Sequence, residues 1–329
     1  MIDRRGLLGT GSAGLAAALL PPRARAAAGR RTGFAPRDIA GAWDLGSYTE
    51  IERPAGFAGL VATPAEAEAY EGPRRKLGGM LPGKPGEVGQ AENEFIDRGT
   101  GLARVKGELR SSWIIDPPDG RIPYTAAAEA LAGTGGPGAP ASAGGGMDNP
   151  EQMGGTTRCL ATVAAGAPIF AAPDANIVQT LLTANHLAIQ SEKYHDVRIV
   201  RILPDARAVA AAPRDPPAWL GCSVGCWEGD ELVVVTAGFH PGVINRGQRI
   251  LTSGATRVTE RFSRLPTGEL LYAFAVEDAD LLTRPWRGEM AFRMTAGRIF
   301  EYACHEGNYS LPGMLAGARL EEREAAAGR

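Results

Sequence analysis

The chain has 329 residues, of which 44% are hydrophobic, and a formal net charge of −2. No long basic run follows the first 28 residues, which argues against nucleic acid as a partner. The apolar run at residues 6–20 is shorter than the roughly 20 residues that a membrane-spanning helix needs, so no transmembrane segment is expected. The length suffices for one large core with elaborations or for two domains.

The N-terminus has the features of an export signal. Arg4 and Arg5 precede the apolar run, and Ala24-Arg25-Ala26 supplies small residues for cleavage. We therefore expect residues 1–28 to be a signal peptide of the twin-arginine type and the mature protein to be periplasmic or secreted. The four cysteines suit an oxidising compartment.

Residues 29–160 are predicted to form a loop-rich N-terminal segment with short elements. The expected elements are a short strand at 41–45, a Pro- and Gly-rich surface loop at 72–89, a strand at 109–115, a short helix at 125–131 that Thr125 caps and Gly133 ends, and a low-complexity stretch at 133–146.

Residues 161–320 are predicted to form a β-domain, followed by a tail at 321–329. The Gly229-Asp230 pair between runs of β-branched and aromatic residues indicates a hairpin. The expected strands are 186–192, 197–203, 222–228, 231–235, 257–264, 269–278, 290–295 and 298–304. About eight strands joined mainly by short turns predict an all-β antiparallel meander; a closed lipocalin-like barrel around one small ligand is favoured over a two-layer sandwich.

Alternation along residues 257–264 singles out one carboxylate. Val258, Glu260 and Phe262 share a face of the expected strand, so Glu260 is predicted to be at least partly buried. Burial disfavours the charged form of a carboxyl group and raises its pKa, which suits a general base.

Several motifs resemble those of a known family. They are Asp116–Tyr124, Arg158-Cys159-Leu160, Asp196-Val197-Arg198, Trp227-Glu228-Gly229-Asp230, Val258-Thr259-Glu260-Arg261-Phe262, Val276-Glu277-Asp278, Thr283-Arg284-Pro285-Trp286 and Glu301–Tyr309. Together they are similar to a widespread, largely uncharacterised family of exported bacterial proteins, over nearly the whole chain after the leader. The resemblance implies export but no particular activity.

Two residues depart from the pattern of that family. Its members commonly have Asp or His where this chain has Cys222, and an acidic residue where it has Val235. Any chemistry that these positions carry in the family is then absent here or altered.

The candidate catalytic residues are Glu260, His305 and Glu306. A histidine beside carboxylates can perform acid–base chemistry near neutral pH, and the expected meander brings residues 298–306 back towards Glu260. The alternative is structural: residues 305–308 form a turn that closes the barrel, and Glu260 pairs with an arginine.

Other side chains are candidates for ligand binding. Guanidinium groups bind planar oxygen pairs, which applies to Arg121, Arg198, Arg261 and Arg284. The expected substrate-binding residues are Arg121, Trp227, Arg284, Trp286, Asn308 and Tyr309. Salt bridges for the arginines and core packing for the tryptophans are the structural alternatives.

The cysteines suggest one disulfide. Cys222 and Cys226 would be about 13 Å apart in an extended strand, too far to bridge. The preferred pair is Cys159 with Cys304. A metal site of Cys222, Cys226 and His240 matches no standard zinc spacing. The sequence shows no phosphate-binding glycine loop, no Gly-x-Ser-x-Gly and no His-Glu-x-x-His, so neither a metal nor an organic cofactor is expected.

Two functional hypotheses follow. The first is an exported β-barrel enzyme that performs cofactor-independent acid–base chemistry, as a lyase, isomerase or hydrolase, on a small and partly apolar molecule. The second is a periplasmic protein that binds a small molecule without turnover. A structural envelope protein is less favoured, because His305, Glu306 and Glu260 are expected to cluster.

Overall fold

The computed structural model describes residues 34–78, 99–133, 149–150, 153, 157–160, 163–164, 166–172, 176–246 and 248–328. The expected signal peptide, residues 79–89 of the expected surface loop and residues 134–146 of the low-complexity stretch lie outside these ranges. Among the helices in the described ranges, none combines the length and the apolar character that crossing a membrane requires.

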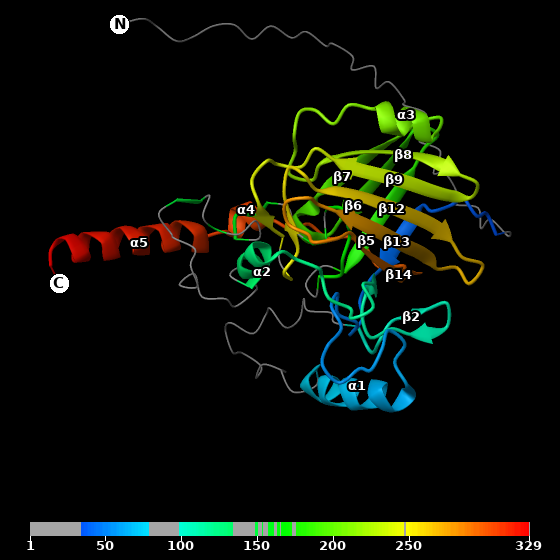
Figure 1. Cartoon of the computed structure of the whole chain (residues 1–329), viewed down its shortest axis with the longest axis horizontal. Coiled ribbons are helices and arrows are strands. Elements are labelled where there is room, and N and C mark those ends of the chain that lie inside the picture. The colour runs from blue at the N-terminus through cyan, green and yellow to red at the C-terminus, as the bar shows by residue number, and fades with distance from the viewer. Residues whose placement is uncertain are drawn as a thin grey trace, which may run out of the picture. The chain divides into compact units, whose positions relative to one another are not determined.

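Nine strands form a closed, mixed β-barrel. They are β1 (Gly41–Asp44), β5 (Ile177–Leu182), β6 (His186–Ser191), β7 (Val197–Ile202), β8 (Cys222–Glu228), β9 (Glu231–Ala237), β12 (Arg257–Arg264), β13 (Leu270–Glu277) and β14 (Trp286–Met294). Each strand pairs with the next in this order (Figure 1). β1 also pairs with β14, where Trp43 lies opposite Met294. The predicted all-β barrel is confirmed.

One neighbouring pair departs from the predicted antiparallel pattern. β7 and β8 run parallel, with Val200 opposite Ser223. The chain between them is long and contains α3 (Ala206–Ala211), which packs on the outer face of β8 through Val209 against Val224 and Cys226 (Figure 1). A connection of this length can return the chain to the end where β7 began, whereas a tight turn cannot.

The last expected strand, 298–304, is wrong. Residues 295–303 form no strand, and the Phe300 amide instead donates to a carboxylate oxygen of Glu192 at 3.2 Å. Both edges of β14 next to this segment are otherwise occupied, because β14 pairs with β13 and β1, and also with β4 (Ile114–Asp116). β1 was expected as a short strand of the N-terminal segment but is part of the barrel, and β5 was not predicted.

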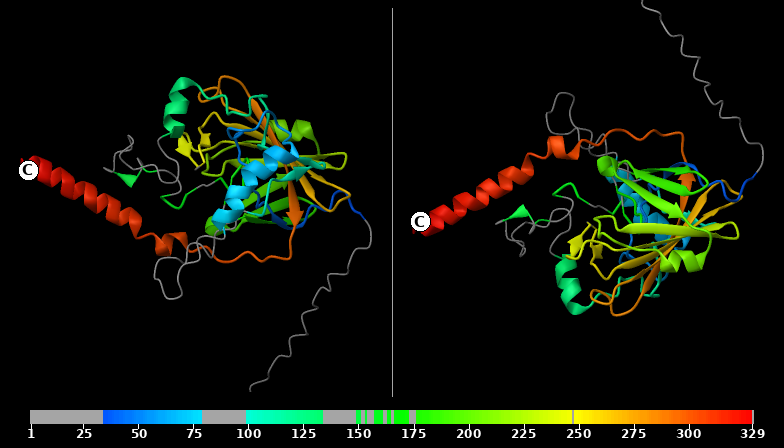
Figure 2. Two further views of the ribbon diagram at one scale, coloured as in Figure 1. Left: turned by 90° about the horizontal axis from the view of Figure 1, so that it is seen from below. Right: turned by 90° about the horizontal axis from the view of Figure 1, so that it is seen from above.

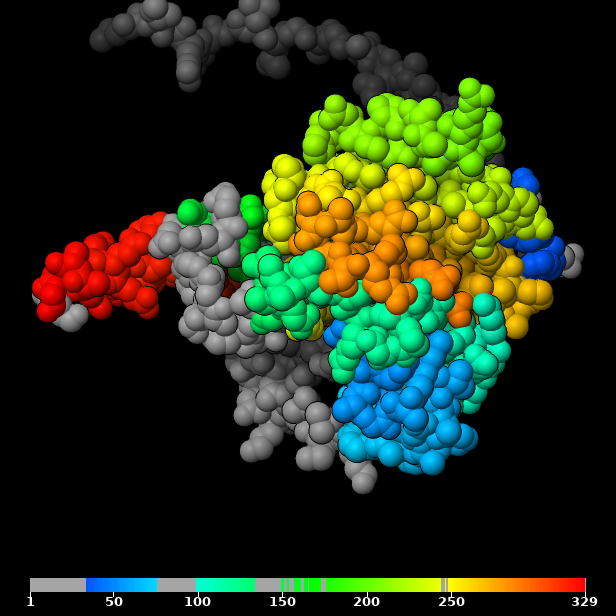
Figure 3. Space-filling view, in the orientation of Figure 1, coloured from blue at the N-terminus to red at the C-terminus, as the bar shows by residue number. Residues whose placement is uncertain are grey.

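The N-terminal segment both wraps the barrel and contributes to it. Besides β4 it contains α1 (Pro64–Gly78), β2 (Arg104–Val105), β3 (Glu108–Leu109) and α2 (Ala126–Gly133). Its blue to cyan surface lies against the orange strand region in Figure 3. Because β1 closes the barrel, the expected boundary near residue 160 does not separate wrapping from barrel.

Part of the expected loop at 72–89 is helical, since α1 continues to Gly78. A capping box starts this helix: the Thr63 amide donates to Glu66 at 2.8 Å, and the Glu66 amide donates to the Thr63 hydroxyl at 3.2 Å. At the other end of the chain, α5 (Ser310–Ala326) runs through the expected start of the tail and has no buried residue.

Side chains fill the barrel interior. Inward-facing Val258 and Phe262 are buried on β12, as the alternation predicted. The ring centroid of Tyr272 lies 5.1 Å from that of Phe262 and 5.6 Å from that of Phe274. These contacts resemble a packed core more than a ligand chamber.

One end of the barrel is covered by a segment that includes residues 166–172. Arg246 donates to the carbonyl oxygens of Ala167 at 2.7 Å and Pro168 at 3.1 Å, so its guanidinium holds this segment in place. A Cβ atom at Gly166 would lie 2.6 Å from the Arg246 Nη2 atom, so a larger residue there would force the guanidinium to move. The adjoining hairpin of β10 (Ile244–Asn245) and β11 (Leu251–Thr252) lies beside α2 (Figure 2).

Candidate functional site

The expected base, Glu260, lies in a set of five inward-facing polar residues that we call the barrel cluster: Arg198, Ser223, Thr236, Glu260 and Tyr272. Both carboxylate oxygens of Glu260 accept from Arg198, at 2.7 Å for Oε1. The Tyr272 hydroxyl donates to the same Oε1 at 2.8 Å. Glu260 is fully buried, so its charge is compensated entirely by side chains.

The electrostatics of the barrel cluster follow from this pairing. Burial acts to lower the pKa of Arg198, but the charge and hydrogen bonds of Glu260 outweigh it and raise that pKa. Burial raises the pKa of Tyr272 well above its ordinary value, and the Glu260 charge adds to this effect. Protein groups therefore bind both oxygens of the Glu260 carboxylate, and Glu260 pairs with an arginine, which is the structural alternative that the sequence left open.

A cavity of about 410 Å³ lies at one end of the barrel. Its wall consists of Cys159, the β6–β7 connection at Tyr194, His195 and Asp196, and the six residues from Glu301 to Glu306, and we call it the end pocket. Its volume falls within the range of about 300–1,000 Å³ that is usual for small-molecule sites. His305 and Glu306 are exposed parts of this wall, whereas Glu260 is not among its residues.

The β6–β7 connection has an unusual backbone. Tyr194 and His195 both have φ of 58°, in the left-handed region that non-glycine residues avoid. Such a conformation costs on the order of 1 kcal/mol per residue and concentrates at functional sites. The two residues belong to the short helix η3 (Lys193–His195), directly before Asp196.

Asp196 is a carboxylate of the end pocket whose pKa is raised. Burial raises the pKa of Asp196 to about 6, although the nearby charges of Arg246 and His305 act to lower it. A carboxyl group with such a pKa can accept and return protons near neutral pH. The residue predicted as acid–base partner, His305, thus lies close enough to Asp196 to influence its charge.

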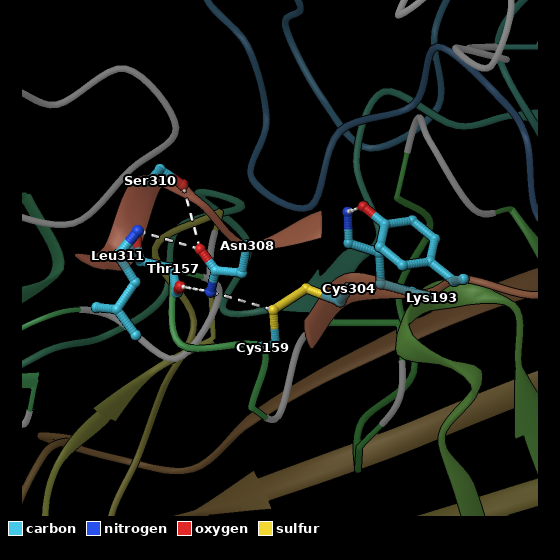
Figure 4. Close-up of a disulfide and its surroundings, with 8 residues drawn as sticks. Thr157, Cys159, Lys193, Cys304, Asn308, Ser310 and Leu311 are labelled. Carbon is cyan, nitrogen blue, oxygen red and sulfur yellow. Dashed lines mark hydrogen bonds between the residues drawn. A yellow bond between two sulfur atoms is a disulfide. The ribbon is translucent and has the colours of Figure 1, made fainter. Parts of the chain in front are cut away.

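A disulfide forms part of the pocket wall. Cys159 and Cys304 are joined, as the sequence led us to prefer, and the bond links residues 145 positions apart (Figure 4). The Asn308 amide donates to the Thr157 carbonyl at 2.8 Å, and its Oδ1 accepts from the Leu311 amide at 3.2 Å at the start of α5. Asn308 is therefore bound to the protein itself rather than directed at a ligand.

Lys193 and Tyr302 form a second polar contact beside the pocket. The Lys193 Nζ atom lies 3.0 Å from the Tyr302 hydroxyl and 4.8 Å from the centre of its ring. Lys193 is only 8% exposed. The Tyr302 ring meets that of Tyr194 edge to face at 5.4 Å, so these residues tie residues 301–306 to the β6–β7 connection.

The predicted ligand-binding arginines lie elsewhere. Arg284 pairs with Asp116 at 2.5 Å, and Arg121 pairs with Glu52 at 3.5 Å, each with about half of its side chain exposed. Neither lines the end pocket. Both arginines form salt bridges, which was the structural alternative to ligand binding.

The predicted aromatic contacts are also outside the pocket. Trp286 is buried and packs at 5.3 Å against Phe274 in the core. Trp227 lies under the guanidinium of Arg37 at 5.2 Å. Tyr309 is 83% exposed and lies beyond the residues of the pocket wall.

The conceivable metal site is not assembled. Within the described ranges, no group of three or more His, Cys, Asp or Glu side chains is arranged to hold a metal ion. The His240 ring stacks on Trp219 at 4.2 Å, and Cys226 is buried beneath α3. Val235 belongs to the same apolar contact, which explains why an uncharged residue suits that position here.

Arg246 connects the two polar regions, and sequence reasoning missed it. Its charge interacts with Glu260 and Arg198 on the barrel side and with Asp196 on the pocket side. Burial lowers the pKa of Arg246 to about 10, and the neighbouring positive charge of Arg198 contributes. Asp196 was not predicted as a site residue; the sequence marked it only in the strand connection Lys193-Tyr194-His195-Asp196 and in the family motif Asp196-Val197-Arg198.

Comparisons with models of protein families, with curated proteins and with solved structures found no match.

Proposed function

We propose that this protein binds a small molecule in the end pocket and performs acid–base chemistry on it, with Asp196 and His305 as the acid–base pair. The observation that carries the proposal is that both groups line one cavity of ligand size and interact through their charges. Asp196 takes the role that the sequence assigned to Glu260. His305 keeps its predicted role, and Glu306 lies beside it on the same wall.

The reaction class is a lyase, isomerase or hydrolase. Each of these can proceed by transferring protons between substrate and side chains, and a positioned acid or base typically contributes about 10²–10⁴-fold in rate. The edges of Tyr194 and Tyr302 give the pocket an apolar component, which suits a small and partly apolar ligand.

The proposal is tested by a ligand screen followed by a turnover assay. Small polar and amphipathic compounds are screened by the rise in thermal unfolding temperature, and the compounds that bind are followed for conversion by NMR. Asp196→Asn and His305→Gln are expected to reduce conversion by about 100-fold or more while the protein stays folded. Full conversion in both variants would exclude the pair.

Matched controls are available at the surface. Asp230→Asn changes an exposed carboxylate in the β8–β9 hairpin, and His186→Gln changes an exposed histidine at the start of β6. Neither residue lines the end pocket, so both controls should convert the compound at the rate of the unchanged protein.

A binding protein without turnover is the second candidate. The observation that favours it is that the fully buried carboxylate of Glu260 already accepts hydrogen bonds from Arg198 and Tyr272 and is therefore structural. Compounds that bind with no conversion, and whose binding Asp196→Asn weakens, would establish this second function instead.

We also propose that the protein is exported. The disulfide between Cys159 and Cys304 supports this, because such bonds persist in oxidising compartments. Replacement of Arg4 and Arg5 by lysine is expected to retain the precursor in the cytoplasm, as cell fractionation would show. Periplasmic accumulation of that variant at normal levels would remove the twin-arginine assignment.

A further inference from the structure

We infer that Tyr302, polarised by Lys193, donates to an oxyanion in the end pocket, and that the substrate is a carbonyl compound with an acidic C–H bond next to the carbonyl group. This inference rests on the proposed function, because it requires the acid–base site of Asp196 and His305. It adds the group that stabilises the negative charge on the carbonyl oxygen of the substrate. It also narrows the reaction to one that passes through an enolate.

The direction of the Lys193 contact is fixed by chemistry. An ammonium group has three N–H donors and no acceptor, so Lys193 donates and the Tyr302 oxygen accepts across their 3.0 Å. A hydroxyl whose oxygen accepts from a cation becomes a stronger donor itself, since hydrogen bonds in a chain polarise one another. Tyr302 lines the end pocket, and the buried Lys193 acts through it.

Asp196 and Tyr302 line the same cavity. Asp196 follows the η3 turn that begins at Lys193, and the Asp196 amide donates to the Lys193 carbonyl at 3.4 Å. The same short segment thus positions the carboxylate and the lysine behind Tyr302. Removal of a proton beside a carbonyl group develops charge on the carbonyl oxygen, and preorganised donors at that oxygen stabilise the transition state.

The step balances without a further reactant. Asp196 accepts the proton as the C–H bond breaks, and the C–H electron pair forms the carbon–carbon double bond. The carbonyl π pair moves to oxygen, where the Tyr302 hydroxyl donates a hydrogen bond. Return of a proton from solvent to the same carbon gives exchange, and return to its opposite face inverts that carbon, which is an isomerisation; His305 at the exposed wall can exchange protons with water.

Deuterium exchange tests this step directly. The folded protein is incubated in D₂O with a panel of small ketones, 2-oxo acids and 3-oxo esters, and loss of the α-proton signal is followed by NMR against buffer alone. Exchange above background is expected for at least one compound. Tyr302→Phe should lower the kcat of exchange about 100-fold with a smaller change in KM. Tyr48 packs near α1, so Tyr48→Phe should leave the kcat of exchange unchanged.

Lys193 is a positioning residue, and its test separates that role from a structural one. Lys193→Met should lower kcat and move the pH profile of exchange, and Lys193→Arg should restore part of kcat, because arginine still donates a charged hydrogen bond. Exchange that Asp196→Asn abolishes and Tyr302→Phe leaves intact would overturn this inference and keep the proposed function. Absence of exchange across the panel would overturn the substrate class, while binding sensitive to Asp196→Asn would still support the pocket.

Discussion

The barrel cluster and the end pocket contain the same kinds of side chain but differ in what satisfies them. In the barrel cluster, Glu260 receives hydrogen bonds from Arg198 and Tyr272 and is fully buried. In the end pocket, Asp196 is partly exposed, faces a cavity and has a raised pKa. A buried charge that protein groups satisfy is costly to leave without its partner, whereas a carboxylate facing a cavity retains proton affinity that a ligand can use.

The largest expected effect comes from breaking the ion pair of the barrel cluster. Arg198→Leu leaves the Glu260 charge buried without its partner and is expected to lower the free energy of unfolding by about 3–5 kcal/mol. Urea denaturation measures this loss. The double variant Arg198→Leu with Glu260→Leu removes both charges and should recover most of the stability; a single variant as stable as the original would contradict a structural role.

Removal of the disulfide is expected to affect both stability and the end pocket. Cys159→Ser with Cys304→Ser opens a long closed loop and should lower the free energy of unfolding by about 2–4 kcal/mol. The same change releases one wall of the pocket, so ligand binding should weaken as well. Denaturation with and without a reducing agent measures the first effect; a protein insensitive to reductant would show that the bond contributes nothing to stability.

A smaller effect is expected from the titration of Asp196. The pKa of Asp196 is about 6 in the folded protein and about 3.8 ordinarily, so the folded state binds the proton more tightly. Stability is therefore highest below pH 4 as far as this group is concerned, falls as the pH rises from about 4 to about 6, and stays low above that. Because the side chain is partly exposed, solvent screening reduces the effect to about 1 kcal/mol.

Asp196→Asn removes the titrating group and should flatten this part of the stability profile. Arg246 and His305, which face the carboxyl group, both favour its charged form, so His305→Gln should shift the fall towards higher pH. Denaturant unfolding at a series of pH values checks both. An identical profile in Asp196→Asn would mean that the group titrates normally.

The smallest effect is expected at the surface. Arg284→Ala removes an exposed ion pair with Asp116, which also pairs with Arg287 at 3.2 Å. Exposed pairs contribute about 0–1 kcal/mol, so the free energy of unfolding should change by less than about 0.5 kcal/mol. Ligand binding should not change. A clear loss of binding would restore Arg284 as a ligand-binding residue.

The sequence predicted the barrel and the inward face of β12, because both depend on local alternation and on turn residues. The alternation of Val258, Glu260 and Phe262 correctly indicated burial of Glu260. It could not identify the partner, since Arg198 is 62 residues away and reaches Glu260 only after four strands have paired. The identity of a buried charge's partner is a property of the closed barrel.

The same limit explains the errors at the C-terminus. Residues 298–304 alternate like a strand, but a strand requires a neighbour with unpaired backbone groups, and the relevant edges of β14 are taken. His305 and Glu306 lie on one wall of the end pocket because they are adjacent in sequence, but Glu260, which was expected beside them, is not among the residues of that pocket. Asp196 reaches the same pocket from the distant β6–β7 connection, and no local pattern indicated that pairing.

The parallel pairing of β7 and β8 has a consequence for how the strand number can change. Directions can alternate around a closed ring only if the ring has an even number of members, so a ring of nine strands contains at least one parallel pair. Here that mismatch is placed at β7–β8, where the α3 crossover supplies the long connection that it needs. If β1 were lost and the ring closed without it, β5 and β14 would meet in parallel, because both are antiparallel to β1. By lying between β5 and β14, the four-residue strand β1 thus avoids a second parallel pair, for which no crossover connection exists between these two strands.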